Sequence, residues 1–408
     1  MLALAEWHSL NAEACEESLA LACAIAPVAI ARGRETARES YDFDDMVYLP
    51  AVEPHIAPPR ASDWVLVDEC QDLNAAQYAV ISQALKPGGR FLFVGDRHQA
   101  IYGFAGAETG MFRRIARELN VHTLPLNICY RCPRSHVALA QKIVPDIESS
   151  PNAEQGLVGR IKYADLLEEL RDDGGGALVL CRANAPLFKL ALELITRNVS
   201  VRLRGNMVVD GLVNLFRRAT HRRAAVLSTD EQISAVELYC FKRAAETKLK
   251  ERPYHAWLDK AECLTHIILA ARGGDVERFI SLVSRSSNDE RAVSLQTVHG
   301  AKGSESDRVF LLKPELMPLE SVVEYGKSWE IAQEWNIKYV ALTRSKRELF
   351  FVESEPREKK HSDIESPSRC HFESRFRDFM WEREVEARSK NEATADEENE
   401  SVRAFSCA

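Results

Sequence analysis

A short apolar run that stops at carboxylates is the feature of this sequence that most restricts its fold. Residues 64–67 are Trp-Val-Leu-Val, and Asp-Glu-Cys-Gln-Asp follows at 68–72. The run predicts a strand buried on both faces of a covered parallel sheet. Ionised carboxylates cannot continue such a strand inward, because an unpaired charge is costly to bury. We therefore expect Asp68 and Glu69 at the carboxyl end of the strand, where open α/β sheets place their ligands.

The rest of the chain alternates between short apolar runs and segments of helical pattern. This alternation favours an α/β fold built on parallel sheets. Residues 205–290 are instead almost wholly helical and polar in pattern, which predicts a helical insertion. Strands are predicted at 91–96, 177–184, 292–298, 308–312 and 349–354, and helices at 1–40, from 74 to the Lys-Pro-Gly-Gly-Arg segment, at 110–120, at 185–198 and at 329–349.

Composition limits the class of protein. The 408 residues are 46% hydrophobic and 28% charged, as in ordinary globular proteins. The apolar N-terminal stretch is too short to cross a bilayer and lacks a basic flank, so we expect an intracellular, soluble protein without a membrane partner. The ten cysteines are scattered. The pair in Cys-Tyr-Arg-Cys at 129–132 has no second pair at ligand spacing, so neither zinc nor redox chemistry is expected there.

Four segments gain meaning when they are taken together. They are Asp-Glu-Cys-Gln-Asp at 68–72, Gly-Asp-Arg-His-Gln-Ala-Ile-Tyr-Gly-Phe-Ala-Gly-Ala at 95–107, the Tyr-Arg of 130–131, and the split pair of Thr-Val-His-Gly-Ala-Lys-Gly-Ser-Glu-Ser and Tyr-Val-Ala-Leu-Thr-Arg-Ser-Lys. Each alone has an ordinary explanation as a solvated loop, a core aromatic or a surface charge. Their joint order resembles superfamily 1 DNA helicases of the UvrD/Rep group, which are 3′-to-5′ translocases with two RecA-like domains. The resemblance runs from about residue 41 to 352.

The resemblance implies a fold and its divisions. It predicts an α/β protein with two RecA-like, P-loop NTPase-type parallel-sheet domains. The first, at 1–125, is expected to be a truncated remnant that carries the acidic strand, and the second, at 126–354, carries the small helical insertion. A charged, largely disordered tail is predicted at 355–408.

The resemblance also implies ATP and Mg²⁺ as the nucleotide and cofactor. Asp68 matches the aspartate that holds Mg²⁺, and Glu69 matches the base that orients or deprotonates the attacking water. A carboxylate that holds the metal beside one that holds water suits phosphoryl transfer, which depends on positioning and charge neutralisation. The remaining nucleotide contacts are Gln71 and Gln99 as sensors of the γ-phosphate, Arg131 and Arg344 as its cationic ligands, Tyr130 on the adenine and Glu305 near the ribose.

Other positions of the resemblance contact DNA. Tyr102 and Phe104 match aromatic residues that stack on bases, and such stacking tolerates any base sequence. Thr297 and His299 match residues that link the nucleotide site to the strand. The expected partner is single-stranded DNA, or DNA with a single-stranded tail; no protein partner is indicated.

The phosphate-binding loop is the missing part. No G-x-x-x-x-G-K-[ST] segment occurs in the sequence, and the nearest, Ser-Val-Val-Glu-Tyr-Gly-Lys-Ser at 321–328, has serine first and bulky residues within. An incomplete chain is therefore expected. Two hypotheses follow: an ATP-driven 3′-to-5′ helicase or translocase, or a non-hydrolysing relic that binds single-stranded DNA or a partner protein. A nuclease-associated helicase subunit is a minor third, and the pathway, such as DNA repair, stays open.

Overall fold

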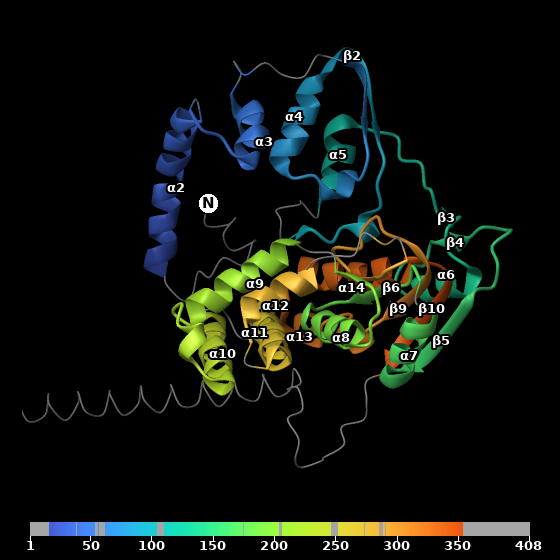
Figure 1. Cartoon of the computed structure of the whole chain (residues 1–408). Coiled ribbons are helices and arrows are strands. Elements are labelled where there is room, and N and C mark those ends of the chain that lie inside the picture. Colours follow the sequence, from blue (N-terminus) through green and yellow to red (C-terminus); the bar gives the residue numbers. More distant parts are fainter. Residues whose placement is uncertain are drawn as a thin grey trace, which may run out of the picture. The chain divides into compact units, whose positions relative to one another are not determined.

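The computed structural model divides into two compact units, one formed by Met1–Arg182 with Glu290–Glu355 and the other by Ala183–Asp289 with Pro356–Ala408. Figure 1 shows the elements along the chain. The structure describes residues 16–37, 39–53, 56, 62–103, 110–173, 175–203, 206–245, 252–272, 274–284, 289 and 291–353. The predicted tail therefore lies outside the described residues. The predicted domain boundary at 125/126 stays a prediction.

The N-terminal part of the first unit contains a pair of parallel strands with helices. Asn74 caps α4 as expected: its side chain accepts from the Gln77 N–H, and the Gln77 side chain accepts from the Asn74 N–H, both at 2.9 Å. The elements are α2 (Glu16–Thr36), α3 (Phe43–Val52), β1 (Ser62–Val67), η1 (Cys70–Asp72), α4 (Ala75–Ala84), β2 (Leu85–Phe93), η2 (Arg97–Gln99) and α5 (Met111–Leu119).

The expectation that the first acidic strand is buried on both faces is wrong. Along β1, Val67 is 8% exposed and packs with Met111 and Ile115 of α5, whereas Trp64 is 55% and Leu66 71% exposed. The reason is that successive side chains of a strand point to opposite faces, and the described helices pack on only one of them. The apolar run identifies a strand without saying how many faces are covered.

A parallel sheet with helices, and a separate pair of strands, β3 and β4, form the rest of the first unit. The five strands that this unit contributes run in the order β5-β10-β9-β6-β8, and their described pairings are parallel. This agrees with the α/β class expected of RecA-like domains. The elements are β3 (Ile128–Cys129), α6 (Arg134–Ala140), β4 (Glu148–Ser149), β5 (Leu157–Lys162), α7 (Tyr163–Asp173), β6 (Leu178–Cys181), β8 (Val293–Thr297), β9 (Ser306–Leu311), η5 (Pro314–Leu316), α13 (Glu320–Tyr325), α14 (Ser328–Leu342) and β10 (Ser345–Glu353).

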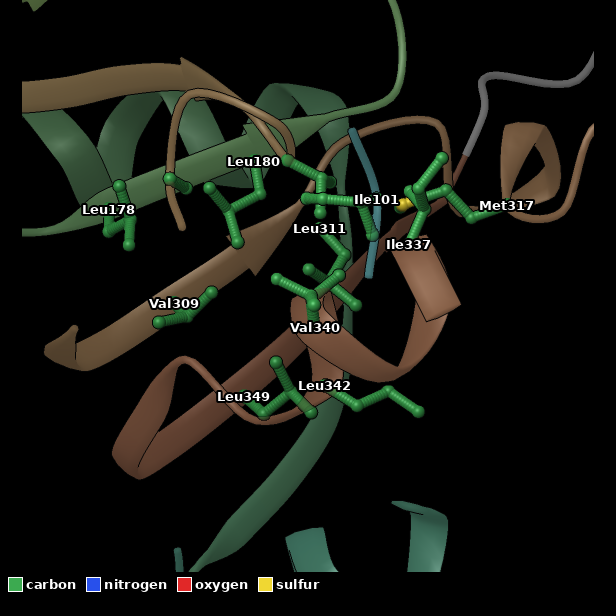
Figure 2. Packing of buried hydrophobic residues seen from close by; sticks show 13 residues of the cluster. Ile101, Leu178, Leu180, Val309, Leu311, Met317, Ile337, Val340, Leu342 and Leu349 are labelled. Carbon is green, nitrogen blue, oxygen red and sulfur yellow. The ribbon is translucent and has the colours of Figure 1, made fainter. Parts of the chain in front are cut away.

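The core of this sheet includes one residue from the N-terminal part of the unit. Ile101 is fully buried among side chains of the strands and of α14, including Leu311 and Val340 (Figure 2). Just before it, the Asn336 side chain of α14 donates to the carbonyl of Ala100 at 3.0 Å. The segment after η2 is thus held on α14 by packing and by hydrogen bonds.

Several predicted bounds need correction. The second strand begins at Leu85, directly after α4, and includes the Lys-Pro-Gly-Gly-Arg segment that was expected to end the helix. The C-terminal helix stops at Leu342, and β10 begins at Ser345, so Arg344 lies between the two elements. Helix α13 precedes Gly326, so the Gly-Lys-Ser segment follows a helix and not the strand that a phosphate loop requires.

The second unit is mostly helical where it is described, and it overlaps the predicted insertion. Asp259 of α11 accepts from the backbone N–H groups of Asn184 and Ala185 at 3.0 and 2.9 Å, and so caps α8. Among the described residues, no helix is long and apolar enough to cross a membrane. The elements are α8 (Ala185–Thr196), β7 (Val201–Leu203), α9 (Asn206–Ala219), η4 (Ala224–Val226), α10 (Thr229–Ala245), α11 (Arg252–Ala271) and α12 (Val276–Ser284).

Candidate nucleotide and DNA site

The two predicted carboxylates directly follow β1, as expected. Val67 pairs with Phe93, so β1 and β2 end at the same edge. The backbone of Glu69 is left-handed, with φ of 51° and ψ of 38°, a conformation uncommon for a residue with a side chain. Its N–H donates to Asp68 Oδ1 at 2.8 Å. The turn therefore brings both carboxylates to the end of the strand.

Gln71 connects the ends of the two strands. It is 2% exposed, its amide nitrogen donates to the Glu69 carboxylate, and its amide oxygen accepts from the Asp96 N–H at 3.0 Å. A Cβ at Gly95 would lie 2.3 Å from that oxygen, closer than atoms can approach. Glycine at position 95 is what allows Gln71 to reach the second strand end.

Gln99 extends this network toward the C-terminal sheet. Its amide nitrogen donates to Asp96 Oδ2 at 3.0 Å, and its amide oxygen accepts from the Arg344 guanidinium at 3.5 Å. The hydroxyl of Tyr339, on α14, also donates to Asp96 Oδ2, at 3.3 Å. Two predicted site residues that are far apart in sequence, Gln99 and Arg344, are thus in contact.

Arg344 is a buried cation. Its side chain is 1% exposed, and its nitrogens donate to the carbonyls of Val340 and Ser304 at 3.0 and 3.4 Å and to Thr343 Oγ1 at 3.3 Å. Within the described part of the chain, no carboxylate forms an ion pair with it. Burial, and then the neighbouring Arg131 charge, lower the pKa of Arg344. A guanidinium nevertheless stays charged at neutral pH, so the site holds a positive charge whose described hydrogen-bond partners are all neutral oxygens.

Arg131 lies in a more open part of the site. It forms an ion pair with Glu305 at 2.6 Å, and Lys346 forms a second one with the same carboxylate at 2.6 Å. The hydrogen bond from Lys346 is the main cause that lowers the pKa of Glu305, and Arg131 adds to it. Tyr130 beside them is 80% exposed. The predicted adenine, ribose and phosphate contacts therefore adjoin one another, with Tyr130 accessible to a ligand.

Lys302 is a component of the site that sequence reasoning missed. Its side chain is 7% exposed, and its ammonium binds the Asp72 carboxylate, lies 3.5 Å from the Glu69 carboxylate and donates to the Gln99 carbonyl at 3.0 Å. Burial raises the pKa of Asp72, and Lys302 opposes that rise. The signal in the sequence was a lysine three residues after His299. Its carboxylate partner lies 230 residues away, which no local pattern indicates.

The predicted DNA contacts are only partly within the described residues. The Tyr102 hydroxyl donates to the His299 carbonyl at 2.9 Å, and the Tyr102 ring packs against the core that contains Ile101. The Thr297 hydroxyl accepts from the Gly300 N–H at 3.2 Å at the end of β8. Phe104 lies outside the described residues. The structure therefore brings Tyr102 to His299, and the roles of these side chains on DNA stay predictions.

Comparison with known families agrees with this arrangement. The UvrD/REP helicase N-terminal domain matches residues 30–120, and the UvrD-like helicase C-terminal domain matches residues 258–355. The first range contains the acidic strand end and Gln99, and the second contains Lys302, Glu305 and Arg344. The chain belongs to the UvrD-like helicases of superfamily 1.

Individual UvrD-like proteins give the same result at low identity. DNA helicase II of Haemophilus influenzae is 21% identical over 76% of this chain and 57% of its own length. DNA helicase II of Escherichia coli is 27% identical over 38% of this chain and 25% of its own length. The PcrA helicase of Leuconostoc citreum is 30% identical over 26% of this chain and 15% of its own length. The chain thus spans less than two thirds of these curated relatives.

The carboxylates of Asp68 and Glu69, which form the acidic edge after β1 of this UvrD-like chain, suit a magnesium ion. Mg²⁺ prefers carboxylate oxygens, and in nucleotide sites it takes one or two of them together with water and phosphate oxygens. Asp68 offers such an oxygen next to Glu69. Within the described residues no group of three or more His, Cys, Asp or Glu side chains could hold a metal without further ligands. Asp68 is the residue that would hold the ion.

Proposed function

We propose that this chain works in an ATP-dependent 3′-to-5′ DNA helicase or translocase that couples ATP hydrolysis to movement on single-stranded DNA. The observation that carries the proposal is the buried Arg344, whose hydrogen-bond partners are all neutral. Burying a cation without an anion is costly. A phosphate provides the missing negative charge and accepts several N–H groups at once, for which a guanidinium is well shaped.

The acidic edge supports the chemistry of hydrolysis. Glu69 is 54% exposed, so a water molecule can reach its carboxylate and give it a proton as it attacks phosphorus. Asp68 would hold Mg²⁺, which when bound neutralises charge on the phosphates. Arg131 and Arg344 stabilise the charge that builds up in the transition state, a role that can be worth roughly 10³–10⁵ in rate.

The hydrogen-bond network supports coupling between nucleotide and DNA. Gln99 contacts Arg344 directly, and its own carbonyl accepts from Lys302. Three residues on, Tyr102 contacts the backbone of His299. A movement of Arg344 toward phosphate would therefore be transmitted through Gln99 to the segment that carries Tyr102.

The absence of a G-x-x-x-x-G-K-[ST] segment from this sequence favours a second candidate function. It is a non-hydrolysing protein that binds single-stranded DNA or a partner protein. The two candidates differ in one measurable property, which is whether DNA stimulates phosphate release.

The test uses the purified chain with MgATP and an oligothymidylate. Under the first function, phosphate release rises when the oligonucleotide is added, and Glu69→Gln abolishes release while it preserves binding of a fluorescent ATP analogue. Oligonucleotides labelled at either end then report direction, with arrival at the 5′ end expected. Binding of the oligonucleotide without phosphate release in the wild-type chain would refute the first function for this chain and support the second.

A further inference from the structure

Two cysteines enclose the tyrosine and arginine of the nucleotide site. Cys129 ends β3, and Cys132 follows after Tyr130 and Arg131. The Cys132 N–H donates to Cys129 Sγ at 3.5 Å. Cys129 is half-buried, and Cys132 is 2% exposed. The turn therefore holds Cys129 Sγ against the backbone of Cys132, and both thiols are free.

The surroundings give the two sulfurs different chemistry. The neighbouring Cys132 thiol is the main cause that lowers the pKa of Cys129 to about 5, with help from the backbone N–H groups and the charge of Arg131. The neighbouring Cys129 sulfur, together with burial, raises the pKa of Cys132. Cys70 shows the contrast, because burial raises its pKa to about 11. Cys129 is thus a thiolate at neutral pH, next to a thiol that keeps its proton.

We propose that Cys129 and Cys132 form a redox-sensitive dithiol that closes to a disulfide when it meets a hydroperoxide. The Cys129 thiolate attacks one peroxide oxygen: an S–O bond forms, the O–O bond breaks, and hydroxide leaves and becomes water by taking a proton from a buffer acid. The Cys132 sulfur then attacks the resulting sulfenic acid. The S–S bond forms, the S–O bond breaks, and the hydroxyl leaves as water with the thiol proton. The two sulfurs are oxidised, and hydrogen peroxide is reduced to water.

The two cysteines lie next to Arg131 and Arg344, the two arginines of the nucleotide site. Arg131 lies between the two cysteines and binds Glu305, while Cys132 Sγ donates to the carbonyl of Thr343 at 3.5 Å, one residue before Arg344. A disulfide would bring the two sulfurs to a bond length of about 2 Å. Forming it pulls the turn together and displaces Tyr130 and Arg131. The effect of this displacement on nucleotide binding rests on the function proposed above.

The expectation against redox chemistry rested on the absence of a second cysteine pair. That absence bears on zinc, which needs four ligands. A dithiol needs only two sulfurs in reach of each other and one thiolate. The spacing alone cannot show this, because most such pairs lack the hydrogen bonds that stabilise the thiolate here.

The chemical test uses the intact, folded chain. Trypsin cuts after Arg117, Arg131 and Arg134, so Cys129 and Cys132 fall on separate peptides, 118–131 and 132–134, which only a disulfide can join. After treatment with hydrogen peroxide and blocking of thiols, we expect the joined pair by mass spectrometry. In Cys132→Ser, Cys129 should stop at the sulfenic acid, which dimedone traps. Cys23→Ser is the matched control, since it removes another free, half-exposed cysteine, and it should behave as wild type.

Reactivity and binding complete the test. Alkylation of Cys129 should be nearly independent of pH above about 6 in the folded chain, whereas in urea it should rise about tenfold per pH unit below the ordinary thiol pKa. Separate peptides after oxidation, or the same pH dependence in both states, would overturn the dithiol. Oxidation should weaken binding of a fluorescent ATP analogue in wild type, reversibly with dithiothreitol, but not in Cys132→Ser. Unchanged binding in a fully joined sample would overturn the regulatory role. Failure of the reduced chain to bind the analogue would count against the proposed function alone.

Discussion

Two buried arginines of the first unit should respond to the same substitution in opposite ways. Arg182, at the end of β6, binds Glu334 of α14 through Nη2 at 2.6 Å and through Nε at 3.2 Å, and that carboxylate is 3% exposed. Arg344 is more deeply buried than Arg182, whose side chain is 12% exposed, and its described hydrogen-bond partners are neutral. Methionine keeps much of the length and flexibility of either side chain but removes its charge. The comparison therefore separates a structural arginine from one kept for a ligand.

The structure sets the size of each effect. Arg182→Met leaves the Glu334 carboxylate buried without its cation, which should lower the free energy of unfolding by about 3–5 kcal/mol. Arg344→Met gives up several hydrogen bonds, but it also removes a buried charge that has no described carboxylate partner, and the desolvation of such a charge costs several kcal/mol, which offsets the loss of the hydrogen bonds. The carbonyl of Val340 keeps a hydrogen-bond donor in the variant, because the Thr343 N–H also donates to it. We expect Arg344→Met to be at least as stable as wild type.

Urea unfolding followed by tryptophan fluorescence measures both variants, with Trp329 and Trp335 of α14 as reporters in the same unit. With an m-value of about 2 kcal/mol/M, Arg182→Met should lower the midpoint by about 2 M. Tripolyphosphate should raise the midpoint of wild type but not that of Arg344→Met, because a ligand stabilises the state that binds it. If Arg344→Met loses as much stability as Arg182→Met, the inference that Arg344 awaits an anion is refuted.

Three further substitutions test other parts of the site. Lys302→Met leaves Asp72 half-buried without its cation and should cost about 2 kcal/mol at pH 7. The pKa of Asp72 is raised in the folded chain and should rise further in the variant. The deficit against wild type should therefore shrink as pH falls through that pKa, and urea midpoints that differ equally at pH 7 and near pH 4 would contradict this. Gly95→Ala places a methyl group against the Gln71 oxygen and should lower the free energy of unfolding by about 1–3 kcal/mol. Thermal unfolding measures this loss, and an unchanged midpoint would show that Gln71 moves freely. Tyr102→Phe loses the hydrogen bond to His299 and should lower the free energy of unfolding by about 1 kcal/mol. The variant should retain its affinity for oligothymidylate, because the ring that stacks on bases is kept. A large loss of affinity, measured by fluorescence anisotropy, would show that the hydroxyl contacts DNA.

Sequence reasoning predicted the helices and strands better than it predicted which of their faces are buried. The strand that precedes Asp68, the cap at Asn74 and the helix α8 follow local patterns, and the structure confirms them. The exposure of Trp64 and Leu66 could not be predicted in the same way, because an apolar run does not specify which faces other elements cover. The start of β2 at Leu85 was hidden by glycine and proline, which usually mark turns.

The sequence predicted most of the residues that form the site, but not which of them contact one another. Ordered motifs identified Gln99 and Arg344, yet their contact arises because η2 is anchored on α14 through Ala100 and Ile101. Arg344 was expected within a helix and instead lies between α14 and β10, where its guanidinium can turn inward. Lys302 was overlooked because its importance depends on the distant Asp72. Such pairings are properties of the folded chain and leave no local pattern.

The side-chain amide of Gln99 imposes a direction on the network. Its nitrogen end faces the carboxylate of Asp96, and its oxygen end faces the guanidinium of Arg344. An amide carries donors at one end and an acceptor at the other, so a half-turn of the group would set donor against donor and acceptor against acceptor. Glutamate would oppose Asp96, and lysine would oppose Arg344. Neither an anionic nor a cationic side chain therefore fits at position 99. The orientation of the neutral amide follows from the anion on one side of it and the cation on the other.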